Sequence, residues 1–166
     1  MAGIVLQQPP TPIYSETAEI QASWQFSGAT MSVLEQSWEE CRVVRQAFIS
    51  PLAILRALLR GENSANYLIQ SLGVDFDALQ VAVQNALVPA RAPAGMDPYL
   101  SPRSKQVLLT SWRETCRWDA DEIEPEHLLI ALLLIEGAAS RILVEHGLGV
   151  DAVKSAFAKA LAKGDN

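Results

Sequence analysis

The chain has 166 residues, of which 49% are hydrophobic and 19% are charged, and its formal net charge is -6 at pH 7. A chain of this length and apolar content can bury a core without disulfides, whereas its acidic excess argues against binding to nucleic acid or to an anionic membrane surface. No apolar run approaches the roughly 18 residues that a membrane helix needs, so we expect no membrane insertion.

Residues 1–25 are expected to form a flexible or extended arm. Pro9, Pro10 and Pro12 exclude a helix there, and the segment has neither the basic start of a signal peptide nor the arginines of a transit peptide. At the end of the arm, Trp24 and Phe26 could pin it to the body of the protein or offer an apolar anchor to another protein.

The rest of the chain is a duplication. A shift of 74 positions places VLEQSWEE, which begins at Val33, on VLLTSWRE, which begins at Val107, and the register continues without a gap to Leu87 and Leu161. Of the 55 aligned positions, 19 are identical, which is far more than chance gives. Self-similarity at a fixed shift indicates two copies of one structural unit.

Each unit is predicted to contain four helices. In the first unit, the first helix begins near Ser27, the second begins at Pro51, the third ends before Gly73 and the fourth runs to Leu87. The corresponding positions of the second unit are Ser101, Pro125, Gly147 and Leu161. Proline suits a first helical turn and glycine suits the left-handed residue that ends a helix, so these residues set the helix boundaries.

The pattern predicts an all-α fold of about eight helices, because no alternating strand pattern interrupts the units. Two four-helix repeats with matching apolar faces should pack with pseudo-twofold symmetry, since each alone buries too little surface. We expect the first repeat at 26–87, a linker rich in Pro, Ala and Gly at 88–100, and the second repeat at 101–163, with both repeats in one compact domain.

The second unit carries short motifs in a fixed order. SPR begins at Ser101, VL at Val107, EHLL at Glu126, EG at Glu136 and GV at Gly149. As a set, these motifs resemble the double Clp-N module, the amino-terminal domain of Clp-type AAA+ unfoldases such as ClpC, ClpA and ClpV. The resemblance covers about residues 26–161 and implies the Clp N-domain fold. The native-looking start and polar finish slightly favour a free-standing, ClpT-like accessory protein over a fragment of an unfoldase.

The resemblance implies two equivalent binding pockets. In ClpC-type members, a threonine at the start of each unit and the glutamate of a Glu-His pair form pockets that read phosphoarginine or adaptor side chains. Carried over, these places are Ser27 with Leu52 in the first unit and Ser101 with Glu126 in the second. Because Leu52 has no carboxylate, we expect a guanidinium group to bind only at the second pocket.

Glu126 and His127 have two interpretations. In the structural one, Glu126 stabilises the positive end of its helix and His127 is a satisfied core histidine. In the functional one, Glu126 accepts a bidentate guanidinium from a partner. No serine or cysteine nucleophile accompanies His127 at a recognisable spacing, and no Walker A loop is present, so we expect no catalysis and no cofactor.

An acidic run precedes the same helix. It comprises Asp119, Asp121, Glu122, Glu124 and Glu126. Such a run is usually a solvated loop that complements a helix amino terminus, and its functional alternative is a docking surface for a basic partner. It lacks the spacing of a calcium loop, so no metal site is predicted.

Cys41 and Cys116 are expected to be buried free thiols in a reducing compartment, either the cytoplasm or, in a photosynthetic eukaryote, the plastid stroma. Trp38 and Trp112 occupy equivalent positions and are expected in the core. The sequence therefore predicts a non-enzymatic protein-protein interaction module of the Clp system. Its partner would be a Clp peptidase, a AAA+ unfoldase, an adaptor or a substrate segment; the alternative is a substrate-recognition N-domain that reads basic or phosphoarginine side chains.

Overall fold

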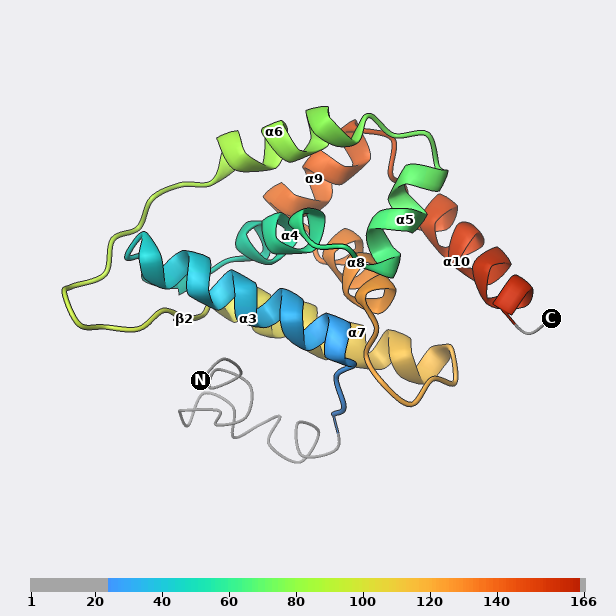
Figure 1. Cartoon of the computed structure of the whole chain (residues 1–166), viewed down its shortest axis with the longest axis horizontal. Coiled ribbons are helices and arrows are strands. Elements are labelled where there is room, and N and C mark those ends of the chain that lie inside the picture. Colours follow the sequence, from blue (N-terminus) through green and yellow to red (C-terminus); the bar gives the residue numbers. More distant parts are fainter. Residues whose placement is uncertain (1–23, 165–166) are drawn as a thin grey trace.

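The computed structural model describes residues 24–164 as a helical body (Figure 1). The first unit contributes α3 (Gly28–Val43), α4 (Pro51–Arg60), α5 (Ser64–Ser71) and α6 (Phe76–Ala86). The second contributes α7 (Pro102–Arg117), α8 (Pro125–Leu134), α9 (Ala138–Glu145) and α10 (Val150–Gly164). Two short strands, β1 (Phe48–Ile49) and β2 (Tyr99–Leu100), precede α4 and α7. The predicted all-α fold of two four-helix repeats is confirmed over the described residues.

Serine side chains begin the long helices of both units. The Ser27 hydroxyl accepts a hydrogen bond from the Thr30 N–H at 3.2 Å, and the Ser101 hydroxyl accepts one from the Ser104 N–H at 3.1 Å. Ser50 caps α4 in the same way. These caps satisfy backbone amides that have no partner inside the helix.

Glycines end the third helix of each unit, as predicted. Gly73 follows α5 with φ of 74° and Gly147 follows α9 with φ of 92°. These values lie in the left-handed region, where a side chain is strained, so glycine suits both positions.

Helices α4 and α8 form the centre of the body (Figure 1). The α8 residues from Pro125 to Leu132 are all buried, as are the α4 residues from Leu52 to Leu59 except Arg56. The other helices make contacts that are equivalent in the two units: α5 packs on α8 as α9 packs on α4, and α10 packs on α5 as α6 packs on α9. These matching contacts between the units are the predicted pseudo-twofold symmetry, and one continuous core joins both units.

Reciprocal backbone pairing also joins the units. β1 pairs in parallel with β2, and at the equivalent place of the other half Phe26 forms a parallel bridge with Ile123. The Ser101 N–H donates to the Ile49 carbonyl and the Ser27 N–H donates to the Ile123 carbonyl, both at 3.1 Å. The first helix of each unit therefore starts from a segment that is paired with the other unit.

Two buried hydroxyls reinforce this pairing. Thr30 Oγ1 donates to the Ile123 carbonyl at 2.7 Å, and Ser104 Oγ donates to the Ile49 carbonyl at 2.6 Å. Both residues are fully buried. Each bond joins residues of different units, so it can form only when the units are packed together.

We expect Thr30→Val and Ser104→Ala each to lower the free energy of unfolding by about 1 kcal/mol, because each removes a buried hydrogen bond while the carbonyl keeps its backbone partner. Urea denaturation followed by circular dichroism measures the loss. Ser32→Ala, at an exposed position of α3, is the control and should stay close to the parent protein. A loss from only one of the two hydroxyl variants would contradict an equivalent role.

The cysteine and tryptophan predictions are only partly correct. Cys41 is buried as predicted, but Cys116 is exposed, so that prediction is wrong. In the repeat register Cys116 corresponds to the exposed Arg42, and both lie on the outer face of their helices. Trp38 is buried, whereas Trp112 is only half-buried.

The short strands were not predicted, because two residues are too few to produce an alternating pattern. Residues 1–23 of the predicted arm lie outside the described part of the chain, and the division at 26–87, 88–100 and 101–163 stays a prediction. In residues 24–164 no single helix has the length and apolarity to cross a membrane. Within these residues, only α8 and α9 taken together are long and apolar enough, and the chain bends by 101° between them.

Candidate functional site

A groove of about 650 Å³ lies at the seam where α5 of the first unit meets α10 of the second. Tyr67 and Leu68 of α5 line one wall, and Ala152, Ala156 and Ala160 of α10 line the other. Tyr67 is 63% exposed. An accessible aromatic ring beside an apolar wall of small side chains is a surface that a partner side chain can cover.

Glu126 brings a carboxylate to this groove. It projects from α8 and shares the lining with Lys159 and Lys163 of α10. Glu126 is only 8% exposed and lies in the first turn of α8, where the positive end of the helix favours a negative charge. The groove therefore combines apolar surface, one sheltered acceptor and two basic side chains.

The pseudo-twofold partner of Glu126 is Leu52, which is equally buried at 8% exposure. The two residues have the same place in the fold and opposite chemistry. The body tolerates either side chain at this place, so packing alone does not require the carboxylate.

The serines that the resemblance assigns to these pockets lie crosswise in the structure. Ser27, which caps α3, lies beside the start of α8, where its hydroxyl donates a hydrogen bond to the Glu124 side chain. Ser101, which caps α7, lies beside the start of α4. Ser27 therefore lies beside the helix that carries Glu126, and Ser101 beside the helix that carries Leu52. The structure does not bring together the predicted pairs, which were Ser27 with Leu52 and Ser101 with Glu126. The reason is the exchange of strands, which carries each serine to the other half. Neither serine lines the groove.

His127 lies in the core and not in the groove. It is 1% exposed, its Nδ1 accepts the Glu124 N–H at 2.9 Å, and its ring stands edge-on to Phe157 with centroids 5.4 Å apart. Burial lowers its pKa to about 4, although the nearby Glu114 carboxylate acts in the opposite direction. At neutral pH the ring is uncharged, as expected for a core histidine. The predicted satisfaction of the ring is only half correct, because its Nε2 is buried without a hydrogen-bond partner among the described residues.

The acidic run divides into exposed and sheltered residues. Asp119, Asp121 and Glu122 are exposed in the loop between α7 and α8. Glu124 is half-buried, and burial raises the pKa of its carboxyl against the opposing hydrogen bond from Ser27. The use of this loop as a docking surface stays a prediction. Over the described residues, no three His, Cys, Asp or Glu side chains are grouped so as to hold a metal ion.

Trp24 and Phe26 pack against the body. Their rings meet edge-on with centroids 6.2 Å apart, and both are half-buried against the common core. The Trp24 Nε1 is buried without a hydrogen-bond partner among the described residues. Both rings therefore contact the body, while residues 1–23 of the arm lie outside the described residues, so the two roles predicted for Trp24 and Phe26, fixing the arm and anchoring a partner, stay predictions.

The fold and the seam together define an all-α domain of two interlocked repeats. The chain belongs to the Clp repeat (R) N-terminal domain family, whose model matches residues 25–146. The family resemblance of the sequence motifs is thereby confirmed.

Individual relatives agree with this assignment. The chain is 28% identical over 144 residues to the chaperone protein ClpB of Bacteroides thetaiotaomicron, and the match covers 84% of this chain but only 17% of that relative. Among solved structures, the Hsp104 N-terminal domain from Candida albicans is similar with a TM-score of 0.70 and 19% identity, covering 80% of this chain and 88% of that one. A ClpV N-domain in complex with a VipB peptide is similar with a TM-score of 0.71 and 18% identity, covering 83% and 88%. At these identities the two structures show the fold alone.

Proposed function

We propose that this chain is a non-enzymatic protein-protein interaction module of the Clp system. It binds a segment of a peptidase ring, an unfoldase, an adaptor or a substrate in the groove between α5 and α10, and so modulates assembly or delivery. The observation that carries the proposal is the Glu126 carboxylate set into an apolar groove at the seam.

Apolar side chains of the groove supply affinity for the partner segment, and the Glu126 carboxylate orients it. Tyr67 and the alanines of α10 offer apolar surface, and burial of an apolar partner side chain there supplies most of the affinity. Glu126 is sheltered, so its charge is less screened by solvent than that of a surface carboxylate. It therefore selects a partner segment with a guanidinium group beside its apolar residues.

The complex of a related fold supports a peptide as the kind of ligand. The ClpV N-domain named above was solved with a VipB peptide, which shows that this fold can hold a peptide in that protein. For the present chain, the groove at the seam is the proposed place.

Glu126→Ala is expected to weaken the binding of a fluorescein-labelled peptide that carries one arginine between leucines by about tenfold or more, because a charge-assisted bidentate contact is lost. Fluorescence anisotropy measures the change. Glu145→Ala removes an exposed glutamate at the end of α9 and serves as the matched control. Equal binding by the parent protein and Glu126→Ala would remove the basis of the proposal.

A second candidate is substrate recognition through phosphoarginine. Lys159 and Glu126 line the same groove, so one could meet the phosphate while the other meets the guanidinium. The same peptide with phosphoarginine in place of arginine tests this function. Tighter binding of the phosphorylated peptide, lost in Lys159→Glu, would favour substrate recognition, whereas a preference for the plain arginine peptide would favour the interaction module.

A further inference from the structure

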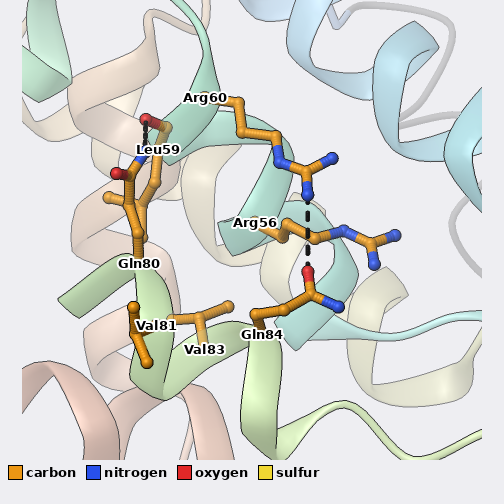
Figure 2. A pocket seen from close by; sticks show the side chains of 7 residues that line it. All are labelled: Arg56, Leu59, Arg60, Gln80, Val81, Val83 and Gln84. Carbon is orange, nitrogen blue, oxygen red and sulfur yellow. Dashed lines mark hydrogen bonds between the residues drawn. The ribbon is translucent and has the colours of Figure 1, made fainter. Parts of the chain in front are cut away.

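A smaller hollow, of about 260 Å³, lies between α4 and α6 within the first unit. Arg56, Leu59 and Arg60 line it from α4, and Gln80, Val81, Val83 and Gln84 line it from α6 (Figure 2). It shares no lining residue with the groove between α5 and α10.

Glu40 of α3 holds the two arginines in place. The Arg56 Nε donates to Glu40 Oε2 at 2.7 Å, and the Arg60 Nη1 donates to Glu40 Oε1 at 2.9 Å. Gln36 donates to the same carboxylate at 3.1 Å. The side chains of Arg56 and Glu40 are only 14% and 17% exposed, so the Arg56 guanidinium is fixed before any ligand arrives.

Donor capacity remains after these contacts. Arg56 uses its Nε for Glu40, and its two terminal nitrogens make no hydrogen bond to the described residues. The Arg60 Nη2 makes one long bond of 3.4 Å to Gln84 Oε1, which is drawn as the dashed line beside Arg56 in Figure 2. Two guanidinium groups and one carboxylate leave a local excess of one positive charge, in a protein whose net charge is -6.

The fold does not require these arginines. In the repeat register Arg56 and Arg60 correspond to Ile130 and Leu134, while Glu40 corresponds to Glu114. The second unit satisfies its glutamate differently, through Arg117 at 2.9 Å and Lys154 at 3.7 Å. The same architecture is thus built without arginines on the central helix. In the first unit the pair also balances the sheltered Glu40 carboxylate, and the donors that Glu40 does not use remain for a ligand.

Apolar surface completes the hollow. Leu59 and Val83 are almost fully buried at its base, and Val81 is 59% exposed at its rim. A side chain that enters can therefore meet a fork of N–H donors and an aliphatic surface together. Carboxylates match the geometry of arginine donors, and an aliphatic neighbour on the same segment can cover Val81.

We propose that this hollow binds an acidic segment of a partner polypeptide, in which a carboxylate contacts Arg56 and Arg60 and an adjacent aliphatic side chain packs on Val81. This second surface is independent of the groove that contains Glu126. The two surfaces share no lining residue, so one chain can hold two different segments at once.

Two labelled peptides of equal length test the proposal, one alternating leucine with glutamate and the other alternating leucine with glutamine. The parent protein should bind the glutamate peptide about tenfold more tightly than the glutamine peptide, and high salt should reduce this preference. Val81→Asp places a negative charge at the exposed rim without touching the core, and it should remove the preference. Arg56→Lys keeps the positive charge beside Glu40 but loses the fork, so it should reduce the preference in part.

Val144→Asp is the matched control, because it makes the same change at a site on α9 that is 58% exposed and outside the hollow. It should bind both peptides as the parent protein does. Val81→Asp, which lies outside the groove between α5 and α10, should bind the arginine peptide as the parent protein does, and this separates the proposal from the proposed function. Equal affinity of the parent protein for the two peptides would overturn the acidic ligand. Displacement of the glutamate peptide by inorganic phosphate at similar concentration would assign the hollow to free anions and would also overturn it.

Discussion

Lowering the pH from neutral to about 4 should reduce the free energy of unfolding by about 3 kcal/mol through His127 alone. In the unfolded chain this histidine takes up a proton near its ordinary pKa of 6.5, whereas in the folded protein it does so only near 4. Between these two values the unfolded state binds more protons, so stability falls as the pH falls. Burial beside Phe157 disfavours the imidazolium more than the nearby Glu114 carboxylate favours it.

His127→Gln isolates this contribution. Glutamine can accept the Glu124 N–H in place of Nδ1, as in a capping box, and it does not titrate. Urea denaturation at a series of pH values should show a flatter profile for the variant between pH 6.5 and 4. Glu124 acts in the opposite direction, because its raised pKa lets the folded state take up a proton more readily and adds stability as the pH falls. This contribution is common to both proteins and cancels in their difference; identical profiles would contradict the role of His127.

Leu55→Ala and Leu129→Ala should each cost about 3 kcal/mol, among the largest losses expected from a single truncation in this protein. Both leucines are completely buried, on α4 and α8, and they are equivalent in the repeat register. Because one core joins the units, each variant should still unfold in a single transition when it is followed by circular dichroism and by tryptophan fluorescence.

The alternative outcome is distinct. If the units folded independently, Leu55→Ala would destabilise only the first unit, and unfolding would occur in two steps with the first unit unfolding first. Leu129→Ala would also unfold in two steps, with the second unit unfolding first. Exposed Leu161→Ala, on α10, controls for the loss of leucine itself and should stay near the parent stability.

The sequence predicts the helices well because their boundaries are local. Pro51, Pro125, Gly73 and Gly147 determine where helices start or stop through their own backbone preferences, and the structure has each where the pattern predicts it. The repeat register also predicts the symmetry, since equivalent apolar faces must meet.

Contacts between distant segments could not be predicted in this way. The pairing of Phe26 with Ile123 and the crosswise position of Ser27 depend on strands of one or two residues, which leave no periodic signal. The same limit applies to the groove, because nothing local to Glu126 indicates that α5 and α10 flank it. A signal for Arg56 did exist: comparison of the two copies shows charge where the other copy has Ile130.

The reciprocal strand pairing has a consequence for the origin of this body. The parallel pairing and the serine N–H bond at Ile49 both recur at Ile123, which is the relation that an isologous interface imposes on two identical subunits. A single ancestral unit could have built this arrangement as a homodimer, in which any substitution would appear on both sides of the axis. Within one polypeptide the two copies are free of that constraint, so Glu126 can stand opposite Leu52, and Arg56 opposite Ile130.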